Sequence, residues 1–178
     1  MNSRRKPPTC IAVCGVKNSG KTTLLVRLVQ YLTGLGYRIA VIKHDGHDFT
    51  CDMPGTDSWR FAHAGAYGTA VYSGSRMFVQ RQGTGETAED LIRQFPEADL
   101  ILLEGCKDSP LSKIEVIRRE ISAKPVSNPE GRFLLVTDWP EGTFAEPALP
   151  FEDIERIADC FLRTAARSES HENAEVPT

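Results

Sequence analysis

Residues 9–28, TCIAVCGVKNSGKTTLLVRL, contain the pattern that most strongly predicts the fold of this chain of 178 residues. It begins with an apolar run, passes through a glycine-bearing turn at residues 15–22, and continues into leucines at helical spacing. A second continuous apolar run follows at residues 39–42. Because strands that are apolar on both faces are typical of parallel sheets covered by helices, this β-loop-α-β unit predicts an α/β protein.

The turn reads GVKNSGKT and matches the pattern GxxxxGK[ST] in full. Its glycines let the backbone curl so that successive N–H groups can point at phosphate oxygens, and the start of the helix adds positive charge. Lys21 is expected to reach the β- and γ-phosphates, and the Thr22 hydroxyl to bind Mg²⁺. A coincidental glycine turn is the alternative, but the strand and helix on either side favour a nucleotide site. The motif residues are Gly15, Val16, Lys17, Asn18, Ser19, Gly20, Lys21 and Thr22.

The remaining apolar patterns complete the predicted fold. Strands are expected at residues 99–105, 113–118 and 132–137, a hairpin at 69–82, a short helix at 86–95 and an amphipathic helix on a face running from Phe151 to Ala165. The fold class is therefore predicted as α/β, a P-loop NTPase fold with a mostly parallel sheet, flanking helices and a β-hairpin extension. We expect an N-terminal arm at 1–8, one nucleotide-binding domain at 9–167 and a disordered tail at 168–178.

Composition excludes several classes of protein. The chain has 21 Lys and Arg against 24 Asp and Glu, a net charge of −3, which argues against a general binder of nucleic acid or anionic membranes. No apolar run is long enough to span a bilayer, so we expect a cytoplasmic protein. Five widely spaced cysteines without a CxxC pair predict neither a disulfide framework nor a zinc site.

An acid that serves Mg²⁺ is expected at the end of a strand beside the phosphate loop. Glu104 ends the run LILLE, whereas Asp99 begins it. Since ligands of parallel α/β sheets gather at the carboxyl ends of the strands, Glu104 is the better candidate. The alternative is an acid that only closes a strand beside a glycine.

A polar segment follows the strand at residues 39–42 and should emerge at the same edge of the sheet. Its acids could bind metal-bound water and its cations could contact phosphate, so Asp48 joins Lys21 and Glu104 as a candidate catalytic residue. A solvated loop is the alternative, and a zinc site at His47 and Asp48 lacks a third ligand. The charged or imidazole side chains of the segment are Lys43, His44, Asp45, His47, Asp48 and Asp52.

The residues alone do not choose between ATP and GTP, because the guanine-reading pattern Asn-Lys-x-Asp does not occur in the sequence. Asp138 ends a late strand on the expected side of the sheet and could accept hydrogen bonds from a guanine edge. An aspartate that forms a turn before Trp139 and Pro140 is the alternative.

Four blocks between Cys10 and Arg118 together resemble the MobB family, the GTP-binding adaptors of molybdopterin-guanine dinucleotide biosynthesis. They read GVKNSGKTTLL, KHDGHDF, DMPGTDSWRFAHAGA and DLILLEGCKDSPLSKIEVIR, with a weaker echo at LLVTDWP. The resemblance implies a protein that binds GTP with Mg²⁺, hydrolyses it weakly and forms a homodimer. It also implies a partner, the guanylyltransferase that joins GMP to molybdopterin, with molybdopterin itself or molybdoenzyme maturation proteins as further candidates.

The resemblance assigns roles to residues as well. It implies that Thr23 also binds phosphate, and that Glu104 and Thr22 bind Mg²⁺. Cys106 departs from the aromatic residue expected after LLEG, which concerns packing more than phosphate chemistry. A second polar wall is expected from Lys43, His44, His47, Asp48, Asp57, Ser58 and Arg60.

Two other functions remain open for the same residues. A small-molecule kinase could use the phosphate loop, the Mg²⁺ acid and Arg60 or Arg81 for phosphoryl transfer. A binding module without relevant catalysis could use nucleotide to order residues 45–55 and present a surface.

Overall fold

The computed structural model describes residues 8–45 and 49–172 of the chain. They form two compact units, one from residues up to His44 together with those from Ala88 onward, and one from Asp45 to Thr87. We call them the sheet unit and the hairpin unit. The predicted domain at residues 9–167 thus contains the hairpin extension as a compact unit of its own.

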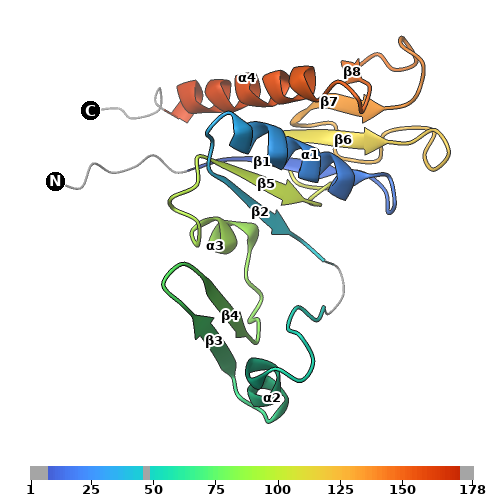
Figure 1. Cartoon of the computed structure of the whole chain (residues 1–178). Helices are drawn as coiled ribbons and strands as arrows, with labels where there is room; N and C mark the ends of the chain where they lie inside the picture. The colour runs from blue at the N-terminus through green and yellow to red at the C-terminus, as the bar shows by residue number, and fades with distance from the viewer. Residues whose placement is uncertain (1–7, 46–48, 173–178) are drawn as a thin grey trace. The chain divides into compact units, whose positions relative to one another are not determined.

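The sheet unit is built on six parallel strands. They are β1 (Thr9–Cys14), β2 (Ile39–Lys43), β5 (Leu100–Glu104), β6 (Lys113–Ile117), β7 (Arg132–Thr137) and β8 (Ala148–Leu149). Their order is β2-β5-β1-β6-β7-β8, and every neighbouring pair is parallel (Figure 1). The predicted mostly parallel sheet is confirmed, whereas the two-residue β8 was too short to be recognised. Because all strands run the same way, the segments after β1, β5 and β6 meet at one edge.

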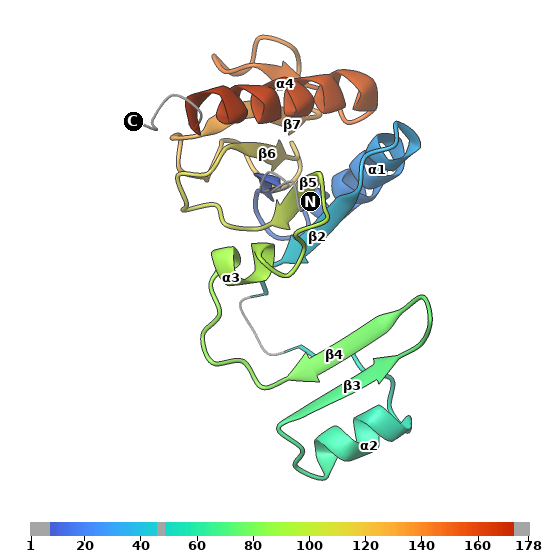
Figure 2. The same ribbon diagram turned by 90° about the vertical axis from the view of Figure 1, so that its left-hand side faces the viewer.

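Helices cover both faces of this sheet. Helix α1 (Lys21–Gly34) and helix α4 (Ile154–Glu172) pack on one face, and the five-residue α3 (Ala88–Ile92) packs on the other (Figures 1 and 2). The larger core includes Leu28 of α1 and Phe161 of α4, both without exposed surface. Full burial of such a side chain stabilises the fold by about 1.5–3 kcal/mol. Residues of β1 and α1 are packed in this core, so both ends of the loop that connects them are fixed.

The boundaries of α4 correct two expectations. Phe151 was placed on the face of the helix, but the helix begins at Ile154, because Pro150 and the next residues form a turn in which Asp153 N donates to Pro150 O. The tail was expected to begin at residue 168, but the helix continues to Glu172. Once a helix is nucleated, each further residue adds a backbone hydrogen bond, so polar residues can extend it.

The hairpin unit contains α2 (Asp57–His63), β3 (Gly68–Tyr72) and β4 (Met77–Arg81). The strands pair antiparallel around a turn in which Ser73 N donates to Arg76 O at 2.8 Å, so the predicted hairpin is confirmed. Thr56 caps α2, since its Oγ1 accepts from Trp59 N at 3.4 Å. No described residue of this unit is buried.

Across the described ranges, no helix combines the length and apolar character needed to cross a membrane.

Candidate functional site

The predicted phosphate loop connects the central strand β1 to α1. Three of its residues have positive φ, namely Gly15 at 135°, Asn18 at 63° and Gly20 at 98°. A Cβ on Gly15 would lie 2.4 Å from the carbonyl oxygen of Val116 in β6, so only glycine fits there. The loop therefore curls directly against the backbone of the neighbouring strand.

Lys21 folds back over this loop. Its Nζ donates to Val16 O at 2.8 Å and to Gly15 O at 3.2 Å, and its side chain is half-buried. The ammonium group therefore lies at the loop backbone, beside the start of α1, where backbone N–H groups favour an anion. By contrast, Lys17 and Asn18 are exposed on the outside of the loop.

The two predicted Mg²⁺ ligands lie in direct contact. Thr22 Oγ1 donates to Glu104 Oε1 at 3.1 Å, because β1 and β5 are neighbours and Glu104 pairs with Val13. A hydroxyl and a carboxylate are hard oxygen ligands, and Mg²⁺ bound by few protein groups keeps waters and phosphate oxygens as its other ligands. The described residues hold no cluster of three or more His, Cys, Asp or Glu that would suit another metal. The pair therefore fits Mg²⁺.

Asp99, the alternative acid, lies at the opposite end of β5. Its Oδ2 accepts from Arg38 N at 2.7 Å, and its Oδ1 pairs with the Arg38 guanidinium at 3.1 Å. It joins the start of β5 to the segment before β2. It therefore lies away from the edge of the sheet at which the phosphate loop is found.

The end of β2 and the residue after it reach the same edge, one strand further out than Glu104. Lys43 pairs in register with Glu104, and His44 N donates to Glu104 O at 3.1 Å. The backbone of Glu104 is thus fixed from both sides, by β1 and by β2. His47 and Asp48, the next predicted site residues, lie outside the described residues.

The other members of the predicted polar wall belong to the hairpin unit. Arg60 and Asp57 form an exposed ion pair of 3.7 Å on α2, and Ser58 Oγ lies 3.3 Å from Thr56 Oγ1. The wall predicted as one surface is therefore distributed over two units.

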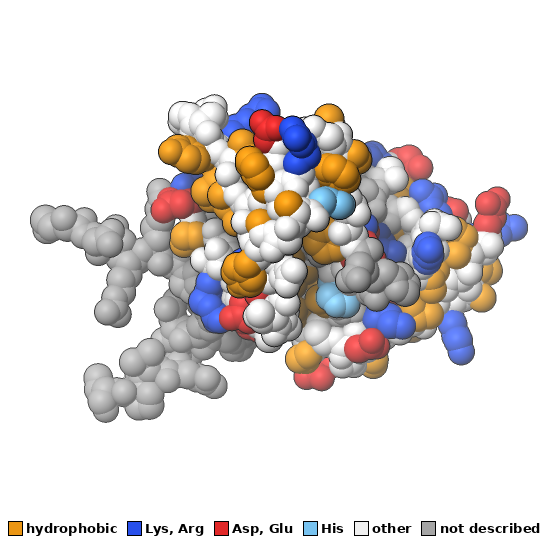
Figure 3. Space-filling view, turned by 90° about the horizontal axis from the view of Figure 1, so that it is seen from below, with side chains coloured by type: hydrophobic (Ala, Val, Ile, Leu, Met, Phe, Trp, Pro, Cys, Tyr) orange, Lys and Arg blue, Asp and Glu red, His pale blue; other side chains and the backbone are white. Residues whose placement is uncertain are grey.

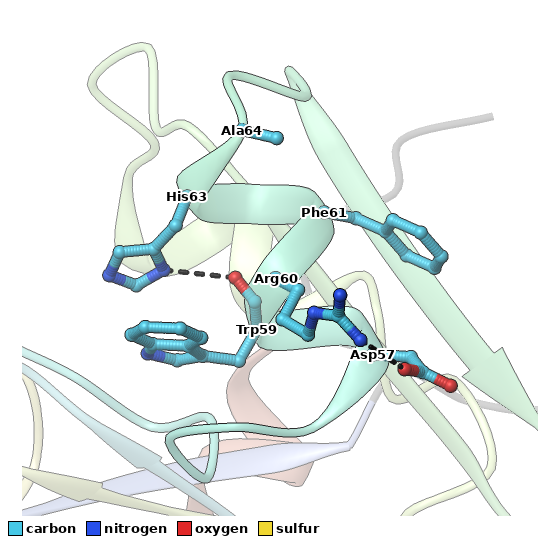
Figure 4. Close-up of a pocket in the computed structure, with 6 residues that line it drawn as sticks. All are labelled: Asp57, Trp59, Arg60, Phe61, His63 and Ala64. Atoms are coloured by element: carbon cyan, nitrogen blue, oxygen red, sulfur yellow. Dashed lines mark hydrogen bonds and ion pairs between the residues drawn. The ribbon is translucent and has the colours of Figure 1, made fainter.

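Helix α2 also lines a cavity of about 590 Å³ (Figure 4). The rings of Trp59 and His63 stack with centroids 3.8 Å apart, and His63 Nδ1 lies 2.9 Å from Trp59 O. A second cavity of about 680 Å³ lies between α2 and β3. Neither of these two cavities includes residues of the phosphate loop. The first cavity is lined by Asp57, Trp59, Arg60, Phe61, His63 and Ala64.

On the other side of β1, Asp138 follows β7 and is engaged within the chain. Its Oδ1 accepts from Arg119 N at 2.7 Å, and its Oδ2 lies 3.5 Å from Arg118 Nη1. Partial burial alone would raise the pKa of Asp138, but these hydrogen bonds and the Arg118 charge outweigh it and lower the pKa. Each carboxylate oxygen accepts more than one hydrogen bond, so Asp138 retains capacity for a ligand.

The sequence interpretation missed Arg118 and the role of Phe151. The Arg118 guanidinium lies over the Phe151 ring, 3.5 Å from its centroid, beside the end of the phosphate loop. A signal for Arg118 was present, because it follows the predicted strand directly and a strand's carboxyl end is where ligands gather. Phe151 carries no such signal, since it comes from a distant turn.

Cys106 packs in the smaller apolar cluster of the sheet unit with residues such as Ala12 and Leu103. It has a φ of 54° and follows Gly105 at 115°, so the chain turns sharply after Glu104. Burial raises the pKa of the Cys106 thiol. Cys106, which stands where an aromatic residue was expected, therefore occupies a position that packs against the apolar cluster.

Comparison with known proteins gives one family. The family profile described as MobB, molybdopterin guanine dinucleotide synthesis protein B, matches residues 10–138. The chain is 34% identical over 134 residues to the molybdopterin-guanine dinucleotide biosynthesis adapter protein of Haemophilus influenzae, covering 73% of this chain and 75% of the relative. It is 36% identical over 122 residues to the protein of the same name from Escherichia coli, covering 65% and 69%.

Solved structures agree on the fold. The crystal structure of Bacillus subtilis MobB matches with a TM-score of 0.69 and 26% identity, over 87% of this chain and 96% of that one. The crystal structure of a MobB homolog from Bacillus stearothermophilus matches with a TM-score of 0.64 and 21% identity, over 89% and 98%. The second likeness concerns the fold alone.

Proposed function

Because the chain belongs to the MobB family, we propose that it is an adaptor that binds GTP with Mg²⁺ when GMP is joined to molybdopterin. One observation carries the nucleotide part of this proposal. Thr22 and Glu104 are in contact beside Lys21 at the mouth of a phosphate loop. A triphosphate and Mg²⁺ are the ligands that this combination of amides, ammonium, hydroxyl and carboxylate suits best.

Each residue has a defined task in this proposal. The loop amides and Lys21 neutralise the β- and γ-phosphates, while Thr22 and Glu104 hold Mg²⁺ directly or through water. Bound Mg²⁺ would supply positive charge to the phosphate oxygens. Asp48 stays a candidate for positioning the attacking water, and hydrolysis is proposed to be weak, in a cytoplasmic protein that acts mainly through its partner.

A homodimer through the hairpin unit is part of the proposal. Tyr72 is 84% exposed and Met77 77% exposed, and they pair across β3 and β4. Hydrophobic side chains reach the surface among charged ones in the space-filling view (Figure 3). A two-stranded hairpin is marginally stable alone, and its edges can pair with a further strand. A second copy of the hairpin would supply one.

The direct test is nucleotide binding by a Lys21→Ala variant, measured by isothermal titration calorimetry with Mg²⁺. We expect it to lose triphosphate binding with the fold intact, because the Lys21 ammonium would act on the ligand. Lys17→Ala is the matched control, since it removes only an exposed side chain of the same loop, keeps the backbone N–H that the motif uses, and should bind normally. Unchanged affinity in Lys21→Ala would overturn the proposal.

Glu104→Gln tests the metal side. It should still bind nucleotide but hydrolyse it more slowly and respond less to Mg²⁺, because a neutral amide is a poorer ligand than a carboxylate. Turnover equal to that of the unmodified protein would assign the metal role to another residue.

A pull-down of the guanylyltransferase with and without GTP tests the adaptor role. Binding that depends on GTP would support it. Phosphorylation of a small metabolite at about 1–100 s⁻¹, the range of ordinary kinases, would favour the kinase interpretation instead.

A further inference from the structure

Arg118 is a second cation beside the phosphate loop, supplied by a different strand. It follows β6, the strand against which the loop packs. A Cβ placed on Gly20 would lie 3.6 Å from both Nε and Nη2 of Arg118. The guanidinium is therefore in van der Waals range of a side chain placed on Gly20, the residue directly before α1.

Two contacts hold this guanidinium in place. Its Cζ lies 3.5 Å from the centroid of the Phe151 ring, and its Nη1 lies 3.5 Å from Asp138 Oδ2. Phe151 is only 4% exposed, and its carbonyl accepts from Arg27 of α1, so the ring is fixed as well. One third of the Arg118 side chain, 33%, stays exposed. The result is a planar cation fixed by its neighbours and partly open to a ligand.

The order of the strands indicates which part of a nucleotide would meet it. Glu104 and Thr22, the Mg²⁺ side, lie toward β5 on one side of β1. Thr22 and Glu104 would hold Mg²⁺ beside the terminal phosphates, so the nucleoside end would extend the other way, across the ends of β6 and β7. Arg118 and Asp138 follow those two strands.

We propose that Arg118 is a specificity-determining residue that contacts the purine and orients Asp138 toward its edge. The inference rests on the proposed function, since it requires a nucleotide in the loop. The planar guanidinium can stack on a base, and the Asp138 carboxylate can accept from the N–H donors of guanine, whereas adenine offers an acceptor at the equivalent ring nitrogen. This pair supplies base recognition in a chain that lacks Asn-Lys-x-Asp.

Arg118→Ala tests this proposal, with binding of GTP, ATP and inorganic triphosphate measured in Mg²⁺ by calorimetry. Base stacking on a side chain accounts for about a tenfold to hundredfold change in affinity on alanine substitution. We expect GTP affinity to fall in this range, the preference for GTP over ATP to narrow, and inorganic triphosphate to bind unchanged. Arg118→Lys keeps the positive charge but lacks the planar guanidinium, so its affinity for GTP should also be lower than that of the unmodified protein.

Arg119→Ala is the matched control. It removes the same charge one residue away and preserves the backbone N–H that binds Asp138, and its guanidinium lies 5.9 Å from the Trp139 ring centroid. It should bind all three ligands normally. Unchanged GTP affinity in Arg118→Ala would overturn the inference, and so would an equal loss for inorganic triphosphate, which would make Arg118 a phosphate ligand.

The outcomes also separate this inference from the proposal on which it rests. If the unmodified protein binds neither GTP nor inorganic triphosphate, the nucleotide proposal itself is wrong. If Arg118→Ala does not fold, Arg118→Lys carries the test, because retention of full GTP affinity by that variant would exclude a requirement for the planar group.

Discussion

The sheet unit and the hairpin unit are stabilised in different ways. In the sheet unit, residues such as Ile11, Leu102 and Ile114 have no exposed surface, and both faces of the sheet are covered. In the hairpin unit no described residue is buried, and apolar side chains such as Tyr72 stay in contact with solvent. One chain thus combines a well-packed support for the phosphate loop with a unit whose apolar side chains stay exposed.

Charged groups follow the same division. Glu115 of β6 is 1% exposed and accepts from Val126 N at 2.6 Å and Ser127 N at 3.0 Å, and it pairs with Arg132 at 3.2 Å. In the hairpin unit, Arg81 pairs with Glu86 at 2.6 Å but stays 46% exposed. Buried pairs are expensive to break, whereas exposed ones contribute little.

Amide hydrogen exchange should show the largest difference. Opening free energies range from about zero for exposed elements to the global value for core strands, so we expect β1 and β5 to exchange at least about a thousandfold more slowly than β3 and β4. Mass spectrometry of deuterium uptake by the free protein measures this. Equal protection would mean that the hairpin unit is already covered, and dilution would then show whether a second copy covers it.

Mutation of two phenylalanines, one in each unit, tests whether burial stabilises the sheet unit more than the hairpin unit. Phe161 is fully buried on α4, and Phe61 is 61% exposed on α2. Phe161→Ala should lower the free energy of unfolding by about 3–5 kcal/mol through lost burial and the cavity left behind. Phe61→Ala should change it by less than about 0.5 kcal/mol. Urea titrations followed by circular dichroism give both values, and similar losses would contradict the division.

Removing a buried charge should have a somewhat smaller effect. Glu115→Gln removes the buried one of the two carboxylates that pair with Arg132, the other being Glu146, so we expect a loss of about 3 kcal/mol in the free energy of unfolding. Glu86→Gln in the hairpin unit is the control and should leave the urea midpoint unchanged. A tolerated Glu115→Gln would show that the backbone donors of residues 126–127 hold this site without the charge.

Thiol reactivity should show the smallest contrast. Burial raises the pKa of Cys14 to about 11 from 9.0, while Cys51 of the hairpin unit is exposed. Since the thiolate reacts, Cys14 should be alkylated about a hundredfold more slowly at pH 8 than an unperturbed thiol. Peptide mapping after iodoacetamide treatment measures both sites, and fast labelling of Cys14 would mean that β1 opens.

The same pKa has a consequence for stability. The folded state disfavours the Cys14 thiolate, so its contribution to stability is fully present below pH 9, the unfolded value, and decreases as the pH rises toward 11. The urea midpoint should therefore fall over this window, and a Cys14→Ser variant should show a smaller fall.

The sequence predicted the parts of the fold that have strong local patterns. The phosphate loop, the apolar strands and the hairpin turn all occur where glycine spacing and periodicity indicated them. It did not predict the division into two units. The sequence pattern of a strand is the same whether apolar residues such as Tyr72 and Met77 are buried or exposed, so the pattern does not show that they are exposed. It also placed Phe151 on α4, since a buried residue in a turn adds to helical periodicity by chance.

Some contacts of the candidate site could be predicted from local sequence patterns, and others could not. Thr22 and Glu104 are in contact because β1 and β5 are neighbouring parallel strands, and the position of each residue at or after the end of its strand predicts both at one edge. The partners of Asp138 are the Arg118 side chain and the Arg119 N–H, which follow β6, and Arg118 in turn lies over Phe151 of the turn before α4; no local pattern joins these segments.

The close fit of Gly15 against Val116 also bears on the order of folding. The phosphate motif is contiguous in sequence, yet the surface that shapes it comes from β6, about a hundred residues later. Closing so long a loop is slow, and contacts of high sequence separation form late. Nucleotide binding should therefore appear during refolding only after β1 and β6 have paired. On the ribosome, a nascent chain that ends before Lys113 would carry the complete motif without the strand against which it takes its shape.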